Sequence, residues 1–124
     1  MINVIAIFIG GGIGSVLRYL TCVVMLQCFN TSLPAATFVV NFVGSLILGL
    51  LFAIFVDRPE INPALKVALT VGFCGGLTTF STFSFELFEM IRNAEFIQAI
   101  VYTLLSVIIC IVAVSLGVYL AKFI

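Results

Sequence analysis

Residues 72–84 read GFCGGLTTFSTFS, a run of glycines, hydroxyl side chains and phenylalanines inside an otherwise apolar segment. The three glycines among residues 72–76 each weaken a helix by about 1 kcal/mol relative to alanine, and the hydroxyls that follow find no partners in hydrocarbon. A helix break at membrane depth is tolerated only where its backbone is buried in protein or lines a cavity. The stretch therefore predicts a broken helix and marks a candidate permeation or binding site.

The composition of the whole chain indicates a membrane protein. Of its 124 residues, 64% are hydrophobic and 8% are charged, whereas soluble domains carry about 25% charged residues. A spanning helix takes about 20 residues, and polar clusters divide this chain into four apolar segments. We predict a single all-α integral membrane domain over residues 1–124, with spans at about 2–26, 35–56, 64–90 and 96–123.

The positive charges near the ends of the spans are almost balanced between the two sides of the membrane. Arg58, Lys66 and Lys122 fall on the side of the N-terminus, and Arg18 and Arg92 fall on the other side. Because Lys and Arg in short loops set the orientation, this balance leaves two outcomes open. Either the chain inserts both ways, which permits an antiparallel dimer of identical subunits, or features other than charge select one orientation.

Small residues and one arginine distinguish the first span. Gly10 with Gly14, and Gly11 with Ser15, are small residues four positions apart, a spacing that lets helix backbones approach closely. We interpret them as a packing surface rather than a phosphate-binding loop, because no strand precedes them. Arg18, near the end of this span, is either an interfacial anchor or a group that attracts anions electrostatically.

The second span carries a polar stripe along one helix face. Asn41, Ser45 and Gly49 follow one another at four-residue spacing, and Thr37 lies one turn earlier on the same face. A buried Asn either bonds a neighbouring helix or offers its NH2 group to an anion. From the residues alone we favour the structural role for Asn41.

Two phenylalanines follow the predicted break in the third span. Phe80 and Phe83 lie three residues apart, so their rings project from nearly the same helix face, and the positive edges of aromatic rings attract small anions weakly. Weak attraction suits conduction, because an ion must be able to leave its site. Composition favours ordinary packing for two phenylalanines among thirteen, but the neighbouring hydroxyls of Ser81, Thr82 and Ser84 shift the balance toward an anion path.

The break and the segment after it offer oxygen atoms for other roles. Backbone carbonyls around Gly75 and Thr78 suit a monovalent cation such as Na⁺, if two subunits bring their breaks together. Glu86 is a carboxylate within a span, which indicates a functional group by default. Its position close to Glu89 and Arg92 equally favours a solvated or salt-bridged side chain.

The fourth span places Tyr102, Ser106 and Cys110 at four-residue spacing. This thin polar track either lines an ion path or consists of hydroxyls that bond their own helix. The cysteines show no metal-ligand spacing, so we interpret them as small apolar filler. The chain contains no histidine, which excludes a Ser-His-Asp triad, and we expect no enzyme.

Three groups of residues together resemble the Fluc (CrcB) family of fluoride channels. The first reads GGIGSVLRY over residues 11–19, the second consists of Thr37, Asn41 and Gly44, and the third reads GGLTTFSTF over residues 75–83. The resemblance covers all four spans in order, and the third group is the most specific.

The resemblance implies an antiparallel, dual-topology homodimer with two narrow fluoride pores and one Na⁺ ion at the dimer centre. It gives the carbonyls of Gly75 and Thr78 to Na⁺ and makes Arg18 the source of an electropositive vestibule. Cys110 stands where a hydroxyl residue is expected in many relatives. The pore residues that the resemblance implies are Asn41, Phe80, Phe83, Ser81, Thr82, Tyr102, Ser106 and Glu86.

The function implied is passive export of toxic fluoride from the cytoplasm through a bacterial inner membrane. A negative-inside potential drives such an anion leak with about 2.3 kcal/mol per charge at 100 mV. We expect fluoride, lipid and a second copy of the chain as partners, and no nucleic acid. A small multidrug exporter would carry a carboxylate in its first span, where this chain has none. A structural membrane subunit would explain the glycines but not the hydroxyl-rich third span.

Overall fold

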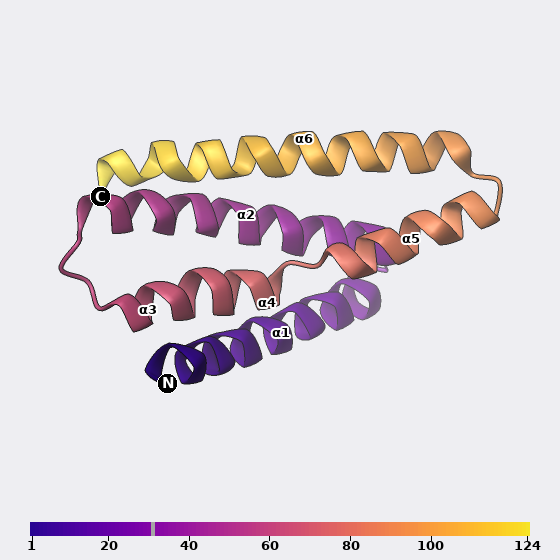
Figure 1. Cartoon of the computed structure of the whole chain (residues 1–124). Coiled ribbons are helices and arrows are strands. Elements are labelled where there is room, and N and C mark those ends of the chain that lie inside the picture. The colour runs from indigo at the N-terminus through magenta and orange to yellow at the C-terminus, as the bar shows by residue number, and fades with distance from the viewer. Residues whose placement is uncertain (31) are drawn as a thin grey trace.

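A computed structural model describes residues 1–30 and 32–124 (Figure 1), and all regular structure in these residues is helical. A helix break lies between Leu77 and Phe80. The elements in chain order are α1 (Ile2–Cys28), α2 (Leu33–Asp57), α3 (Pro63–Val67), the π-helical segment η1 (Ala68–Cys74), α4 (Gly75–Leu77), α5 (Phe80–Arg92), α6 (Phe96–Leu120) and a final 3₁₀ turn η2 (Ala121–Phe123).

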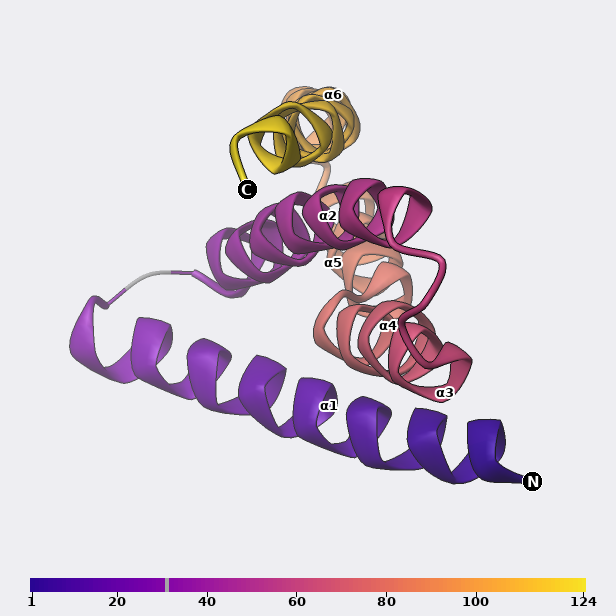
Figure 2. The same cartoon turned by 90° about the vertical axis from the view of Figure 1, so that its left-hand side faces the viewer.

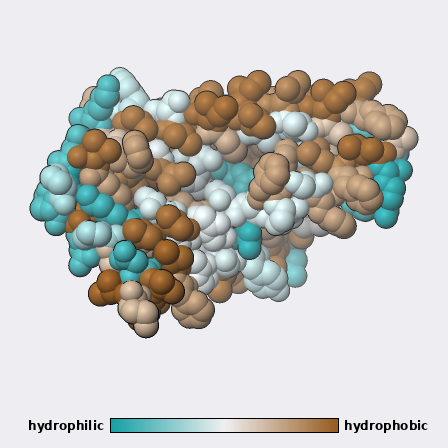
Figure 3. Space-filling view, viewed as in Figure 1, coloured by the Kyte–Doolittle hydropathy of each residue, from teal (hydrophilic) through white to brown (hydrophobic). Residues whose placement is uncertain are grey.

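The predicted division into four membrane spans is confirmed. Helical segments long and apolar enough to cross a membrane cover Ile2–Cys28, Pro34–Asp57, Pro63–Arg92 and Phe96–Phe123, within two residues of the predicted bounds at every end. Hydrophilic residues gather at the two ends of the molecule, and hydrophobic residues cover much of the surface between them (Figure 3). Both termini lie at the same end (Figure 1), as four crossings require.

Prolines and a cap start the helices where the sequence predicts spans. Pro34 stands in the first turn of α2 and Pro63 opens α3, where a missing backbone N–H costs nothing. The Asn62 side chain accepts a hydrogen bond from the Ala64 N–H at 2.8 Å, which caps α3. Local sequence chemistry therefore sets both helix starts.

The spans are arranged in layers, with α6 against α2, the third span next, and α1 on its far side (Figures 1 and 2). The contact between α2 and α6 is close because glycines stand at the crossing. A methyl group added to Gly49 would meet the Val114 backbone, and one added to Gly117 would meet the backbone of α2. Ala113, beside this crossing, is completely buried.

The small residues of the first span form a packing surface, as predicted, and the structure shows that α1 lies directly on the third span there. A methyl group added to Gly10 or Gly14 would overlap the backbone of η1, and one added to Gly72 or Gly76 would meet the backbone of α1. The glycine pairs of the first span therefore form a packing surface.

The break in the third span is confirmed, but its predicted cause is wrong. The glycines of residues 72–76 lie within helical structure, and the chain leaves the helix at Thr78 and Thr79, whose ψ angles are 159° and 121°. Packing of Gly72 and Gly76 on α1 offsets their low helix propensity. Glycine here serves close helix contact, and the two threonines form the break.

Candidate functional site

The break is held by hydrogen bonds from its own threonines. The Thr78 N–H and hydroxyl both donate to the Cys74 carbonyl, at 3.0 and 2.9 Å, and so end the first half of the span. The Thr79 hydroxyl oxygen accepts from the Thr82 N–H at 3.2 Å and caps α5. The N-terminus of α5, the positive end of its dipole, therefore lies inside the span Pro63–Arg92.

Asn41 supports the break from the neighbouring helix α2. Its Nδ2 donates to the Thr79 carbonyl at 3.1 Å, and its Oδ1 accepts from the Thr79 N–H at 2.7 Å. One side chain thus satisfies both backbone groups of a residue that has left the helix. The amide also has a second N–H that the pair with Thr79 does not use. The structural role that we favoured for Asn41 is confirmed.

Arg18 reaches the same break from α1. Its Nη1 donates to the Thr78 carbonyl at 3.3 Å, and the side chain is partly buried. The arginine therefore brings a positive charge to the break itself. Gly75 lies one turn earlier and is exposed, with no atom close to the position that a Cβ would take.

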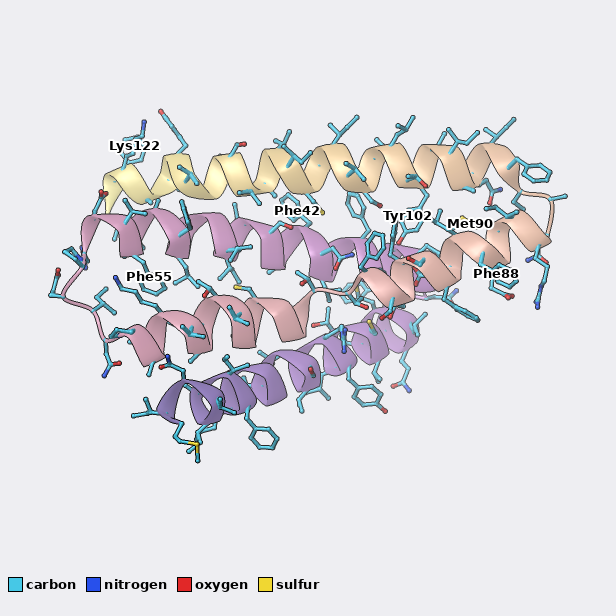
Figure 4. All side chains as sticks on the ribbon, in the orientation of Figure 1. Phe42, Phe55, Phe88, Met90, Tyr102 and Lys122 are labelled. Atoms are coloured by element: carbon cyan, nitrogen blue, oxygen red, sulfur yellow. The ribbon has the colours of Figure 1, made fainter. Side chains whose placement is uncertain are left out.

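Glu86 joins three helices through two hydroxyl groups. The Thr37 hydroxyl donates to Oε1 at 2.6 Å, and the Tyr102 hydroxyl, which lies between α6 and α5 (Figure 4), donates to Oε2 at 2.8 Å. The carboxylate is 6% exposed. Of the two alternatives left open for Glu86, the solvated or salt-bridged side chain is therefore wrong, because Glu86 is buried against hydroxyls and Arg92 pairs with Glu89, at 2.7 Å.

Three aromatic rings after the break contact one another in a row, at tilted angles. Phe83 is buried between Phe80 and Tyr102, with ring centroids 5.7 and 5.1 Å away. Phe80 is 78% exposed, so it is the surface member of these three rings. The prediction that Phe80 and Phe83 share a helix face is correct, because their rings are in contact. The two rings differ in burial because Phe83 also packs on α6.

A cavity of about 360 Å³ opens beside the break, between the third span, α2 and α6. Phe80 and Phe83 line it, and so do the thiols of Cys74 and Cys110. Ser106 also lines it; its buried hydroxyl lies close to the Tyr102 hydroxyl and makes no other side-chain hydrogen bond among the described residues. The polar residues of the wall are Asn41, Ser45, Thr70, Thr78, Thr79 and Ser106.

A family model described as CrcB-like protein, Camphor Resistance (CrcB), matches residues 5–118. This chain belongs to the CrcB family. The CrcB match includes the break, the cavity wall and both phenylalanines.

Several curated relatives of this CrcB chain carry the name fluoride-specific ion channel FluC. One from Flavobacterium psychrophilum is 41% identical over 122 residues, which is 98% of each chain. One from Gloeothece citriformis is 38% identical over the same length and share, and one from Aquifex aeolicus is 40% identical over 119 residues, 96% of each chain. The similarity is therefore end to end rather than local.

The predicted site residues of the CrcB chain fall into two neighbouring groups. Asn41, Phe80, Phe83 and Ser106 line the cavity, and Tyr102 connects to it through Phe83. The second group is a set of hydroxyls at the start of α5. The Ser81 and Thr82 oxygens lie 3.3 and 3.0 Å from that of Thr79.

Sequence reasoning missed the part played by Thr79. Its backbone pairs with Asn41, and its hydroxyl caps α5. The signal was present, because a threonine directly before a resumed apolar helix is a typical N-cap. From the sequence we associate Ser81, Thr82 and Ser84 with an anion path, and we give Thr79 no role of its own.

Proposed function

We propose that this CrcB protein is a fluoride-selective channel that lets fluoride leave the cytoplasm passively. The observation that carries the proposal is the end-to-end similarity to proteins named fluoride-specific ion channel FluC. The cavity beside the helix break supports it, because hydrogen-bond donors and aromatic rings meet there inside a membrane span.

The proposed path for fluoride runs along the cavity wall. Fluoride is a small anion that accepts strong hydrogen bonds, and Ser106 and the spare N–H of Asn41 are donors at the wall. The positive end of the α5 dipole and the ring edges of Phe80 and Phe83 add weak attraction.

We propose that Glu86 acts on this path through Tyr102 rather than by binding the ion. Both of its oxygens accept hydrogen bonds from hydroxyls. A carboxylate in direct contact with fluoride would repel it, because both are negatively charged. The carboxylate holds the Tyr102 ring against Phe83. Glu86 therefore orients the aromatic rings that border the path.

We also propose that the channel is an antiparallel, dual-topology homodimer in a bacterial cytoplasmic membrane. The small number of positive residues at the span ends, three on the side of the termini and Arg92 on the other, gives only a weak preference for one orientation and so supports insertion in both. The exposed ring of Phe80 supports a second subunit, because a path beside this ring needs a wall on its open side. The relatives named above come from bacteria.

A Na⁺ ion between the two breaks is the proposed cofactor. The neutral oxygen atoms there suit a monovalent cation, and the Arg18 charge on the Thr78 carbonyl opposes its binding. The Thr78 carbonyl has a second lone pair besides the one that Arg18 uses, and the Gly75 position is open. Neutral carbonyl oxygens without a carboxylate suit Na⁺ better than a divalent ion. In this role the ion would be bound by carbonyl oxygens from the breaks of both subunits and would hold the two subunits together.

Fluoride efflux from liposomes tests the proposal. Purified protein is reconstituted with potassium fluoride inside, valinomycin is added, and an electrode records fluoride release, with a parallel chloride preparation. We expect rapid fluoride release and no chloride release above empty liposomes. Equal release of both ions contradicts selectivity, and no release of either ion from well-folded protein contradicts the channel function.

A further inference from the structure

Cys110 brings a thiol to the cavity wall. It lies on α6 one turn after Ser106, is partly exposed, and forms no disulfide. Cys74 also lines the cavity but is only 2% exposed, whereas Cys22 and Cys28 are not part of the wall. Of the thiols in the described part of the chain, Cys110 therefore has the best access to the cavity.

The surroundings of Cys110 favour reaction of its thiol. The cavity volume of about 360 Å³ leaves room for several small molecules, since one molecule of water takes about 30 Å³ in the liquid. A thiol reacts as the thiolate, which needs water or a hydrogen-bond donor nearby. Ser106 lies one turn away on the same helix face, and its buried hydroxyl lies close to that of Tyr102. Hydroxyl groups are therefore near enough to donate to a thiolate at Cys110.

We propose that Cys110 is a covalent modification site for small, uncharged, thiol-directed electrophiles, and that the adduct obstructs the ion path. The obstruction rests on the proposed function, whereas the modification itself does not. Uncharged reagents are favoured because Leu48, Phe80 and Val107 contribute apolar wall and the cavity lies within the spans. A methylthio group bound to Cys110 would occupy space beside the Ser106 hydroxyl.

The reaction can be written for methyl methanethiosulfonate as the probe. The Cys110 thiol gives its proton to water, and the thiolate attacks the sulfenyl sulfur of the reagent. A new S–S bond forms to Cys110, the bond to the sulfonyl sulfur breaks, and methanesulfinate leaves with the electron pair. The cysteine sulfur is oxidised, the thiosulfonate is reduced, and a reducing thiol reverses the change.

The experiment combines peptide mass spectrometry with fluoride efflux on the same liposomes. Treated and untreated samples are compared within each variant, so that every variant is its own reference. Cys110→Ser removes the proposed site but keeps a small polar side chain. Cys74→Ser removes the buried thiol of the same cavity, and Cys28→Ser removes an exposed thiol outside it.

We expect a methylthio group on Cys110, and a fall of about tenfold in wild-type efflux, which corresponds to about 1.4 kcal/mol added to the barrier. Dithiothreitol restores the efflux, Cys110→Ser is insensitive, and the other two variants remain sensitive. The proposal is overturned if Cys110 stays unmodified while Cys28 reacts, or if modified Cys110 leaves efflux unchanged. It is also overturned if Cys110→Ser is inhibited like the wild type. Absence of efflux before treatment refutes the channel function, and the mass spectrum still decides whether Cys110 reacts.

Discussion

Asn41 supplies the hydrogen bonds that Thr79 loses by leaving the helix. The amide pairs with the N–H and the carbonyl of one residue, at 2.7 and 3.1 Å. In a membrane, a backbone group without a partner costs several kcal/mol, so the break can exist only with such a substitute. This structural role does not exclude contact with an anion, because the second N–H of the amide is left over.

Removal of this amide is expected to destabilise the protein. In Asn41→Ala the two backbone groups of Thr79 lose their partners, which costs about 1–3 kcal/mol for each group that stays buried. Thermal unfolding in detergent should show a clearly lower midpoint. Gln98→Ala removes an exposed amide from α6 and should leave the midpoint unchanged. Equal midpoints for the two variants would refute the supporting role of Asn41.

The hydrogen bond from Tyr102 to Glu86 can be tested without removing the aromatic ring. Tyr102→Phe keeps the contact with Phe83 but leaves one oxygen of the buried carboxylate without its donor. We expect a loss of about 1–3 kcal/mol in stability and slower fluoride efflux. Tyr119→Phe, which alters an exposed tyrosine on the same helix, is the matched control. A Tyr102→Phe protein that behaves like this control would exclude the role given to Glu86.

At the scale of residues, sequence reasoning finds site members more easily than their partners. Asn41, Ser106 and the two phenylalanines are recognisable because polar or aromatic side chains at regular spacing are unusual in a span. The hydrogen-bond partners of Glu86 are not recognisable in the sequence, because Thr37 and Tyr102 lie 49 and 16 residues away in the chain. Glu89 and Arg92 are near in sequence, and that proximity suggested the wrong pairing for Glu86.

The third span shows what helix propensity does not predict. Glycine weakens an isolated helix by about 1 kcal/mol, yet Gly72 and Gly76 remain helical because they lie against the backbone of α1. The number and bounds of the spans depend on hydrophobic length, which is visible in the sequence. The point at which the third span breaks depends on contacts with α1 and α2, and the sequence does not show these contacts.

The glycine contact between α1 and the third span can be tested with two neighbouring substitutions. In Gly10→Ala the new methyl group overlaps the Ala68 carbonyl, and such overpacking costs about 1–3 kcal/mol. In Gly12→Ala the new methyl group meets no atom within 4 Å, and better helix propensity stabilises by up to about 1 kcal/mol. Thermal unfolding should therefore separate the two variants in opposite directions. The same shift in both would contradict the packing role of Gly10.

For the molecule as a whole, the small number of positive charges at the span ends predicts two orientations in the membrane. Three positive residues lie on the side of the termini, Arg92 lies on the other side, and Arg18 lies at the break inside the spans. Glu60→Lys adds a fourth to an exposed loop on the side of the termini. We expect this change to retain the termini in the cytoplasm, because Lys and Arg in short loops favour that side.

Protease protection of a C-terminal tag in inverted vesicles measures the orientation. We expect wild-type tags on both sides and Glu60→Lys tags mostly on one side, with lower fluoride efflux because antiparallel pairs are lost. Glu60→Gln removes the same carboxylate without adding a positive charge and should behave like the wild type, since acidic residues contribute little to orientation. A wild-type tag found on one side only would contradict the dual topology.

The most direct test of the fluoride path at the break is the efflux rate of Phe80→Ile in liposomes. The Phe80 ring lines the cavity and is 78% exposed on the chain, and Phe52→Ile removes a ring that is 62% exposed on α2, away from the cavity wall. We predict that Phe80→Ile folds and elutes like the wild type but releases fluoride at least about tenfold more slowly, a barrier increase of about 1.4 kcal/mol, while Phe52→Ile keeps the wild-type rate. Equal rates for the two variants would mean that fluoride does not cross the membrane beside this ring.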